Sequence, residues 1–270
     1  MSECNHDCSN CKEKCDKVDL IAPANSCSKV GKVIAVVSGK GGVGKSSITS
    51  LLATKTNALG YKTAILDADI TGPSIPTAFG IKEQAYGMDG NIIPLESSRG
   101  IKIMSLNCLL DDPTQPVVWR GAMISNTVKQ FWTDVAWGDV DYMFVDMPPG
   151  TGDVPLTVFQ SLPIDGIVIA TTPQELVGII VAKAVKMAQL MNVPILALVE
   201  NMSYYECPKC GEKLYIFGQS DLDKACKEYD IPCHGSLPID TMLAKSMDAG
   251  TIEDYLNNYL DDIVKEIVKK

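Results

Sequence analysis

The segment 39–46 (GKGGVGKS) constrains the fold of this chain more than any other part of the sequence. It matches the pattern G-x-x-x-x-G-K-[ST], which is the spacing of a phosphate-binding loop. An apolar run rich in β-branched residues, 33–38, precedes it, and a stretch with the apolar spacing of a helix, 46–59, follows it. Gly60 stands where such a helix ends. A strand, a glycine-rich turn and a helix in this order are the context in which the pattern binds phosphate.

The chemistry of this loop follows from its residue types. Glycines allow the backbone to turn so that successive N–H groups point toward a phosphate, and the N-terminus of the following helix adds a partial positive charge. We expect Lys45 to contact the β- and γ-phosphates of a nucleotide and Ser46 to bind Mg²⁺. The residues expected to surround the phosphates are Gly39, Gly41, Gly42, Val43, Gly44, Lys45, Ser46 and Ser47.

Three acidic residues at the ends of predicted strands indicate hydrolysis of the nucleotide. Asp146 ends the apolar run 140–146, and Asp67 and Asp69 end the run 63–69. Ligands of a parallel sheet bind at the carboxyl ends of its strands, so these carboxylates are expected at the edge that holds the phosphates. We assign Asp146 to the Mg²⁺ site, and Asp67 and Asp69 to orientation of the attacking water. The chain is therefore predicted to be a nucleoside triphosphatase.

The order of the predicted elements indicates an α/β fold with three layers. Apolar strands alternate with helical segments, which is typical of a mostly parallel central sheet flanked by helices on both faces. A helix is expected from about 174 to 191, and 251–270 is expected to form an amphipathic helix whose apolar face runs from Leu256 to Ile267. The strand candidates are 33–38, 63–69, 101–107, 140–150, 166–172, 194–202 and 235–240.

The chain divides into an N-terminal extension and one domain. Residues 1–17 show no apolar periodicity and cannot form a core of their own, and 18–31 has the composition of a linker. We therefore expect a Cys-rich extension and linker over 1–31 and a nucleotide-hydrolysing domain over 32–270. An insertion near 203–218, which carries a Cys-x-x-Cys pair, interrupts the alternation of strands and helices.

Charge and hydropathy exclude several classes of protein. Lysine and arginine total 24 and aspartate and glutamate total 33, which gives a net charge of −9 and no basic field for a nucleic acid. The apolar runs are too short to span a bilayer, so no membrane partner is expected. The N-terminus lacks the apolar segment of an export signal, which predicts a cytoplasmic, reducing location. The 10 cysteines are then expected to be buried apolar residues or metal ligands rather than disulfides.

Cys207 and Cys210 form the pair within the insertion, and they supply two ligands where a 4Fe-4S cluster or a structural zinc ion requires four. A twofold-symmetric dimer brings the same pair from a second chain. Alternatively, Cys226 and Cys233 complete a zinc site within one chain, although a helix and a strand are predicted there. A bridging cluster, a zinc site and a redox dithiol are all compatible with the pair. Cys108 follows a strand and is expected in the core.

The cysteines of the N-terminal extension form a second candidate metal site. Four thiols so close together in the sequence can bind one cluster or one zinc ion. Cys27 or His6 can replace one of these ligands, and the alternative is a disordered, cysteine-rich tail. The four thiols are those of Cys4, Cys8, Cys11 and Cys15.

Five segments together resemble one known group of ATPases. The segments are GKGGVGKSS, LDADITGPS, VDMPPGTGD, TTPQE and ENMS. They resemble the deviant-Walker P-loop NTPases of the MinD, ParA and nitrogenase iron protein group, and are most similar to the Mrp-type (ApbC-like) iron–sulfur cluster carrier ATPases. The resemblance implies a homodimer that binds ATP and Mg²⁺ and holds a bridging 4Fe-4S cluster on Cys207 and Cys210 of each chain. It also implies that ATP hydrolysis is coupled to assembly of the cluster and its transfer to apo iron–sulfur proteins, with scaffold proteins as further candidate partners.

The resemblance also assigns roles to individual residues. Lys40 takes the position of the signature lysine, a catalytic residue that reaches across the dimer to the nucleotide of the second chain. Asp69 takes the position of the water-orienting acid of switch I, Asp67 lies near Mg²⁺, and Asp146 begins switch II. Asn201 takes the position of the amide that contacts adenine.

Three other functions are weighed against this one. A positioning ATPase of the MinD or ParA kind uses a C-terminal helix to bind a membrane, but acidic residues outnumber lysines over 251–270, which favours packing against the domain. In nitrogenase-like reductases, which transfer electrons, the two cysteines of each chain lie far apart in sequence, unlike Cys207 and Cys210. A zinc-binding P-loop ATPase is the third alternative.

Overall fold

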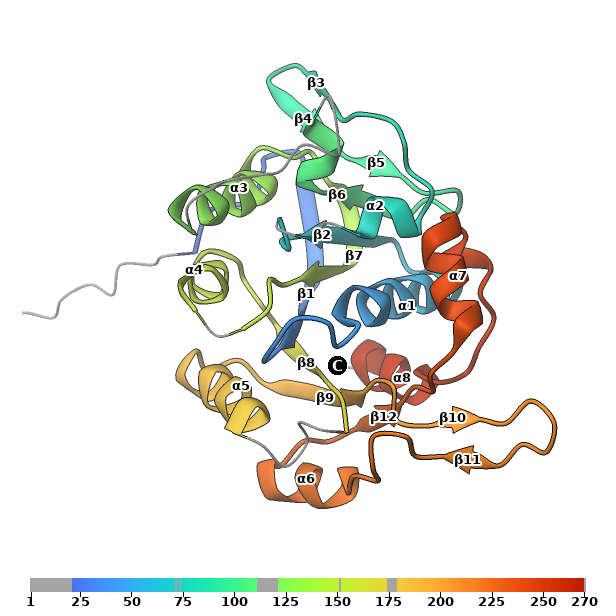
Figure 1. The fold of residues 1–270 in the computed structure, drawn as a ribbon. Helices are drawn as coiled ribbons and strands as arrows, with labels where there is room; N and C mark the ends of the chain where they lie inside the picture. The colour runs from blue at the N-terminus through green and yellow to red at the C-terminus, as the bar shows by residue number, and fades with distance from the viewer. Residues whose placement is uncertain are drawn as a thin grey trace, which may run out of the picture.

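A mostly parallel β-sheet forms the centre of the protein (Figure 1). The computed structural model describes residues 21–70, 72, 74–110, 121–150, 152–173 and 179–269. Within these residues the sheet has eight strands, and β5 at one edge runs antiparallel to its neighbour. The strand order is β12 (His234–Ser236), β9 (Ile195–Glu200), β8 (Gly166–Thr171), β1 (Ser28–Ser38), β7 (Gly138–Asp146), β2 (Thr63–Asp67), β6 (Lys102–Met104) and β5 (Leu95–Glu96).

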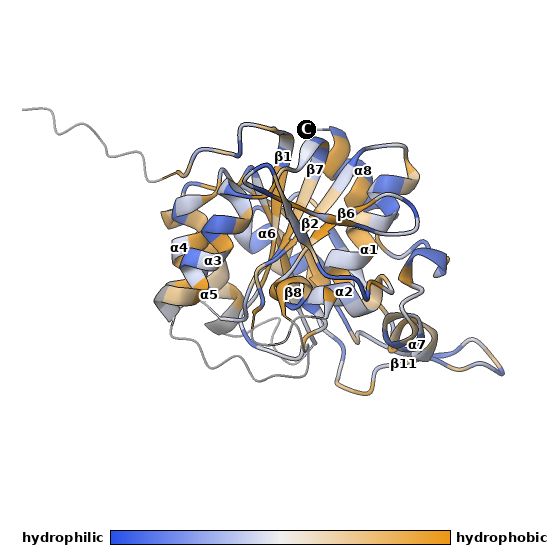
Figure 2. Ribbon diagram, turned by 90° about the horizontal axis from the view of Figure 1, so that it is seen from above, coloured by the Kyte–Doolittle hydropathy of each residue, from blue (hydrophilic) through white to orange (hydrophobic). Residues whose placement is uncertain are grey.

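Helices cover both faces of this sheet, as the view from above shows (Figure 2). Two separate apolar cores lie between the sheet and the two helical layers. The predicted three-layer α/β architecture is therefore confirmed. The helices on one face are α3 (Gly121–Thr133), α4 (Asp153–Ser161), α5 (Ile179–Leu190) and α6 (Leu222–Tyr229), and those on the other are α1 (Lys45–Ala58), α2 (Ile75–Ala78), α7 (Thr241–Ala249) and α8 (Asp261–Lys269).

Strand β1 shows why the strands are continuous apolar runs in the sequence. Val33 and Val37 pack in the core beneath α3–α6, whereas Ile34 and Val36 pack in the core beneath α1 and α8. Successive side chains of a strand point to opposite faces, so a strand covered on both sides needs apolar residues at every position. The central place of β1 brings the loop that follows it between the ends of β7 and β8.

Residues 21–31 pack against the domain instead of linking it loosely to the N-terminus. β1 begins at Ser28, ahead of the predicted boundary at Lys32. Ala22 is buried and its N–H donates to Ser161 O at 2.8 Å. The first residues of β1 alternate in exposure, because only one side of this end is covered, and the polar residues among them gave the segment the composition of a linker.

The C-terminal helix is shorter than predicted. A 3-10 turn at Ile252–Asp254 precedes it, and α8 starts only at Asp261. Leu256, which was expected on the apolar face, is 90% exposed and lies in the connection between the two. Lys55 Nζ donates to Asn257 O and to Asp261 Oδ1, each at 2.6 Å, and these bonds hold the connection in a non-helical path across α1. For the helix predicted from 174, the structure describes α5 from Ile179 onward.

Two small antiparallel hairpins project from the sheet. One pairs β3 (Tyr86–Met88) with β4 (Asn91–Ile93). The other pairs β10 (Tyr205–Glu206) with β11 (Lys213–Leu214) and extends away from the body of the protein (Figure 1). Apart from the hairpins, a 3-10 turn at Leu106–Leu109 follows β6. The helices of the described part are all too short or too polar to cross a membrane.

Candidate functional site

The predicted phosphate loop connects β1 to α1 and opens onto a cleft of about 480 Å³. Gly39 directly follows β1. Gly42 and Gly44 both have φ near 80°, a left-handed conformation that favours glycine and turns the backbone toward the cleft. The residues that line the cleft are Ser38, Lys40, Gly41, Gly42, Val43, Gly44, Lys45, Ser46, Ser47, Asp69, Gly72, Ser74, Thr77, Pro149, Met247 and Asp248.

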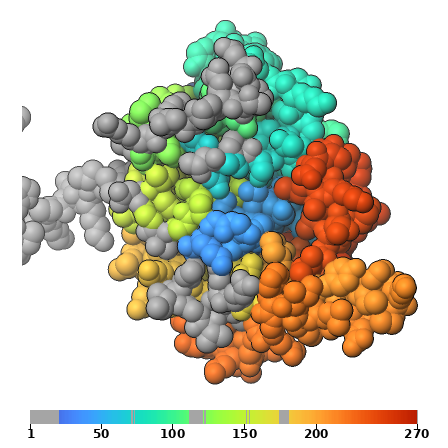
Figure 3. Space-filling model, in the orientation of Figure 1, coloured from blue at the N-terminus to red at the C-terminus, as the bar shows by residue number. Residues whose placement is uncertain are grey.

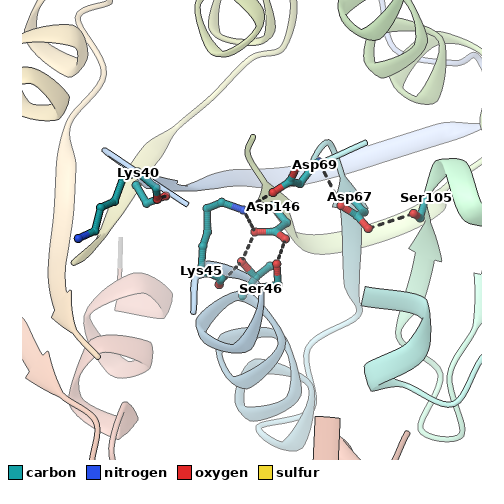
Figure 4. A network of polar contacts seen from close by, with 9 residues as sticks. Lys40, Lys45, Ser46, Asp67, Asp69, Ser105 and Asp146 are labelled. Carbon is teal, nitrogen blue, oxygen red and sulfur yellow. Dashed lines mark hydrogen bonds and ion pairs between the residues drawn. The ribbon is translucent and has the colours of Figure 1, made fainter. Parts of the chain in front are cut away.

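A buried ionic network lies at the floor of this cleft (Figure 4). Lys45 Nζ contacts Asp146 Oδ1 at 2.9 Å and Asp69 Oδ2 at 3.3 Å. Asp146 is fully buried, and it also accepts hydrogen bonds from Ser46 Oγ at 2.5 Å and from Thr49 Oγ1 at 3.1 Å. Burial alone lowers the pKa of Lys45, but the carboxylates of Asp146 and Asp69 raise it above its ordinary value. Lys45 is therefore a stable cation at the place where phosphate charge is expected.

Asp67 is buried, as Asp146 is, and neither of these two acids lines the cleft. Figure 4 shows it on the far side of Asp69 from Lys45, where its Oδ2 accepts from Ser105 Oγ at 3.0 Å. Its Oδ1 accepts from the N–H of Asp69 at 3.1 Å. Burial and the nearby charge of Asp146 raise the pKa of Asp67 well above its ordinary value. Asp67 therefore positions the backbone of Asp69 from below, while Asp69 itself lines the cleft.

Ser105 and Thr49 belong to this network, although the sequence motifs did not single them out. Ser105 follows β6, the next strand beyond β2, and Thr49 stands one helical turn after Lys45. Thr49 Oγ1 contacts both Lys45 O and Asp146 Oδ1. Both residues could have been found from their positions in the sequence. Ser105 stands at the end of a parallel strand, and Thr49 shares a helix face with Lys45.

Lys40 and Lys45 point in different directions from the same loop (Figure 4). The Lys40 side chain is exposed and extends away from the carboxylates, whereas Lys45 is buried among them. The Lys40 carbonyl accepts from Ser38 Oγ at 2.8 Å, which fixes its backbone. An exposed lysine at the rim of the cleft is able to contact a second molecule, as its predicted role requires.

The loop and its neighbours fit a nucleotide with Mg²⁺. Gly44 is the N-cap of α1 and provides no side-chain cap, so the first N–H groups of the helix are open to phosphate oxygens. The hydroxyl of Ser46 and the carboxylate of Asp146 lie together, and oxygen atoms of these two types are ligands that Mg²⁺ prefers. This donor set suits a metal held jointly by protein and phosphate.

Asn201 is buried behind the phosphate loop. Its Nδ2 donates to Val43 O at 2.9 Å, and its Oδ1 accepts from the N–H of Met202 at 2.9 Å. The structure thus places the predicted adenine-contacting amide against the loop itself.

Cys207 and Cys210 lie in the turn between β10 and β11, within a projection that we call the thiol hairpin (residues 203–220). The N–H of Cys207 donates to Glu212 O at 2.9 Å, and the N–H of Gly211 donates to Cys207 O at 2.8 Å. Backbone N–H groups of Lys209 and Cys210 hydrogen-bond to the Cys207 sulfur and lower the pKa of this thiol. The thiolate is the form of cysteine that reacts and that binds metals.

The other described cysteines do not join this pair. Cys226 is buried on α6, and burial raises its pKa to about 11, as it also does for Cys108 in the core. Cys233 packs partly against the opposite core. Among the described residues, no group of three or more His, Cys, Asp or Glu side chains is placed to hold a metal ion. The four-cysteine zinc site with Cys226 and Cys233 is therefore wrong, because these two residues serve packing.

The N-terminal cysteines fall outside the described residues. Cys27, which precedes β1, is exposed. The predicted site at Cys4, Cys8, Cys11 and Cys15 stays a prediction.

Residues 29–270 match the model of one protein family, the NUBPL iron-transfer P-loop NTPases, within the ParA group. An iron–sulfur cluster carrier protein of Methanocaldococcus jannaschii is 41% identical, over 100% of this chain and 97% of its own length. A protein of the same name from Clostridium perfringens is 40% identical, over 92% of this chain and 94% of its own.

Solved structures show the same architecture. A nucleotide-binding protein of Archaeoglobus fulgidus in complex with ADP is 43% identical and superposes with a TM-score of 0.78, over 86% of this chain and 91% of its own. The MinD cell division protein of Aquifex aeolicus, in complex with MinC, superposes with a TM-score of 0.62 at 20% identity, over 89% of this chain and 96% of that one. The second similarity concerns the fold alone.

Proposed function

The chain belongs to the family of NUBPL iron-transfer P-loop NTPases, and on this premise we propose that it is an ATP-dependent carrier of iron–sulfur clusters. Relatives that cover nearly the whole chain at about 40% identity bear that name. In this proposal ATP is the substrate, and the cluster is the cargo that is loaded and then transferred to apo-proteins. One observation supports the proposal most. The domain that holds the ion pair of Lys45 and Asp146 at its phosphate loop also carries a Cys-x-x-Cys turn that stabilises a thiolate.

The ATPase half of the proposal rests on the cleft above α1. Backbone N–H groups of residues 41–46 and the Lys45 ammonium bind the phosphates, and Ser46 and Asp146 hold Mg²⁺, which neutralises phosphate charge when bound. Asp69 lines the cleft and orients the attacking water, while Asp67 and Ser105 keep the Asp69 backbone in place. Lys40 supplies a second positive charge to the nucleotide of a partner chain.

The carrier half rests on ligand number. Cys207 and Cys210 supply two thiolates, and a cubane 4Fe-4S cluster takes four. The thiol hairpin extends from the body of the protein, so two copies related by a twofold axis can bring four thiolates together. Each chain then contributes half of the site, and the cargo is released when the two hairpins separate.

An apolar segment beside the thiols supports this arrangement. Residues that follow the cysteine turn expose large hydrophobic side chains next to β10 and β11. Two hairpins that meet at a cluster bury these side chains against one another, which removes apolar area from water and shields the cluster. The side chains concerned are Leu214, Tyr215, Ile216 and Phe217.

Anaerobic reconstitution with iron and sulfide tests the carrier function. We expect the protein to take up about four iron atoms per dimer at the hairpins, the content of one 4Fe-4S cluster. Cys207→Ala and Cys210→Ala should each lose this uptake, whereas Cys27→Ala, at another exposed cysteine, should retain it. Absence of uptake by the wild type, or uptake that is unchanged in Cys207→Ala, contradicts the proposal.

The N-terminal thiols need their own control in this experiment. We propose that they form a second metal site, because four thiols close in sequence match the ligand number of a cluster or of zinc. Serine substitution of all four should lower the total metal content and leave the hairpin-dependent part intact. We place the activity in the cytoplasm, where a reducing environment keeps such thiols available. The residues substituted are Cys4, Cys8, Cys11 and Cys15.

A further inference from the structure

Asn201 forms a tight connection between the phosphate loop and the chain that leads into the thiol hairpin. Asn201 is 6% exposed, and both polar atoms of its side-chain amide are used: Nδ2 donates to Val43 O, and Oδ1 accepts from the N–H of Met202. A Cβ atom on Gly44 would lie 2.1 Å from Asn201 Nδ2, so no space separates the amide from the loop. Close packing of this kind transmits a displacement instead of absorbing it.

Glu200, the preceding residue, fastens both ends of the thiol hairpin. Its carboxylate is 1% exposed and accepts hydrogen bonds from Ser203 Oγ at 2.6 Å and from Ser220 Oγ. Ser203 opens the hairpin and Ser220 closes it, so one buried carboxylate joins the two ends. Separation of either end takes one of the two hydroxyl donors away from this buried carboxyl group and leaves that oxygen without it, which is costly. The two ends therefore move together with Glu200.

Direct contacts continue from this base to the thiols. The N–H of Ile239 donates to Tyr204 O at 2.7 Å, and Lys213 Nζ lies 4.2 Å from the centre of the Tyr204 ring. The two strands of the hairpin pair beyond that point, and the N–H of Cys207 donates to Glu212 O. The hairpin is thus held internally, so that a shift at its base changes the position of the cysteine turn.

We propose that Glu200 and Asn201 are positioning residues that couple nucleotide occupancy of the phosphate loop to the placement of Cys207 and Cys210. Phosphate binding orders the N–H groups on both sides of the Val43 carbonyl, and this carbonyl is the group that Asn201 contacts. Figure 3 shows the loop and the segment that leads into the hairpin side by side on one face. The route is separate from switch II, which follows β7.

The purpose of this coupling rests on the proposed function, because a nucleotide that moves the thiols alters how the cargo is held. The coupling itself concerns cluster-free protein and is measured there. Reduced protein is alkylated with and without Mg²⁺–ADP or a non-hydrolysable ATP analogue, and peptide mass spectrometry gives the rate at each cysteine. Cys27 is the internal reference, since it is exposed and lies at the opposite end of β1 from the loop.

In the wild type we expect nucleotide to change the alkylation rates of Cys207 and Cys210 by about fivefold or more, the lower range of measured couplings between sites. The rate at Cys27 should not change. Ser220→Ala removes one hydroxyl from the Glu200 contact and should bring the ratio of rates toward one, without loss of ADP affinity. Ser220→Thr keeps the hydroxyl and should restore the wild-type ratio.

The control variant is Thr127→Ala on α3, which also removes a hydroxyl, one that donates to Met123 O far from this route. A merely structural role for Ser220 raises the rates with and without nucleotide by the same factor and leaves their ratio intact. A wild-type ratio of one, or a wild-type ratio in Ser220→Ala, overturns the coupling. If Ser220→Ala does not fold, the ratio of alkylation rates is measured in Glu200→Gln instead. A ratio near one supports the coupling, and a wild-type ratio overturns it. Failure of the proposed function is distinct, because it shows as absent iron uptake with the ratio preserved.

Discussion

The nucleotide cleft and the thiol hairpin are built in opposite ways. In the cleft, Asp146 is fully buried and Lys45 is 6% exposed, and each contacts oppositely charged or hydroxyl groups of the same chain. In the hairpin, Cys210 is exposed, Cys207 is half-buried, and the described residues of one chain offer no further metal ligand beside them. The ionic network of the cleft is formed within one chain, whereas the two thiols of the hairpin are half of the four ligands that a 4Fe-4S cluster takes.

This difference matches what each site must do with its ligand. A phosphate-binding site gains from charges that are fixed before the nucleotide arrives, because prearranged charges need no reorganisation during the reaction. A site for a transferable cargo must also release it, and thiolates shared between two exposed turns are lost when the turns separate. Burial of the charged groups in the cleft therefore suits nucleotide hydrolysis, and exposure of the thiols suits transfer of a cargo.

Removal of the loop lysine should have the largest effect, on both catalysis and folding. In Lys45→Ala, Asp146 stays buried without its cation, which we expect to cost about 3–5 kcal/mol of stability. ATP hydrolysis should fall by about 10²–10³-fold or more, as for loss of a preorganised charge. Urea unfolding and phosphate release measure the two effects. Lys40→Ala is the matched control: it should lower hydrolysis with a change in stability within about 0.5 kcal/mol, because Lys40 is exposed. Equal stability of the two variants contradicts the buried-pair interpretation of the cleft.

Substitution of a hairpin cysteine should separate function from stability. Cys207→Ser should abolish iron uptake at the hairpin with little change in stability, because Cys207 lies in a projecting turn outside both apolar cores. Cys226→Ser should do the reverse, because a hydroxyl without a partner in the core costs about 1–3 kcal/mol. Iron content and thermal unfolding of the two variants give the comparison. Loss of iron in Cys226→Ser at retained stability is the result that contradicts it.

The cleft could be predicted from sequence to a larger extent than the hairpin's connections. The G-x-x-x-x-G-K-[ST] pattern between a strand and a helix predicts a phosphate loop, and acids at the ends of parallel strands meet at one edge, which agrees with the contacts of Lys45 with Asp69 and Asp146. The pattern could not show that Asp67 lies beneath Asp69, or that Ser105 supports it. The placement of Ser105 beside Asp67 depends on the register between β2 and β6, which is a tertiary property.

The hairpin shows what a linear pattern leaves out. The Cys-x-x-Cys pair and the insertion around it are visible in the sequence, but the contact between Asn201 and Val43 joins positions far apart in the chain. The C-terminal helix is shorter than predicted for a related reason. Leu256 has the right spacing for an apolar face, yet Lys55 of α1 binds the chain beside it and keeps it from forming helix. Long-range hydrogen bonds of this kind override local periodicity.

A buried acid at the base of the cleft, Asp67, should limit the stability of the protein near neutral pH. Burial raises the pKa of Asp67, so its neutral form is favoured in the folded state. The stability contributed by this group is fully present below its unfolded pKa and is lost as pH rises through the raised folded pKa. Asp67→Asn should therefore raise the melting temperature at pH 7 by a few degrees, since the amide oxygen can accept from the Asp69 N–H while the amide NH2 donates to Ser105 Oγ, the reverse of the present bond. The gain over wild type should shrink as pH falls toward 4. Thermal melts between pH 4 and 8 measure this, and a variant less stable than wild type at pH 7 contradicts it.

The pH dependence of thiol reactivity is the smallest expected effect and compares the hairpin with the core directly. Backbone N–H groups stabilise the Cys207 thiolate and lower its pKa, whereas burial raises the pKa of Cys226 to about 11. Because the thiolate is the reacting form, alkylation of Cys207 should reach its half-maximal rate at a lower pH than that of an added free-cysteine peptide, and Cys226 should stay nearly unreactive up to about pH 10. Peptide mass spectrometry after short exposures at pH 6–10 gives all three profiles from one sample. A Cys207 midpoint equal to that of the free-cysteine peptide would show that the turn does not stabilise a thiolate, and the contrast between the hairpin and the core would then rest on exposure alone.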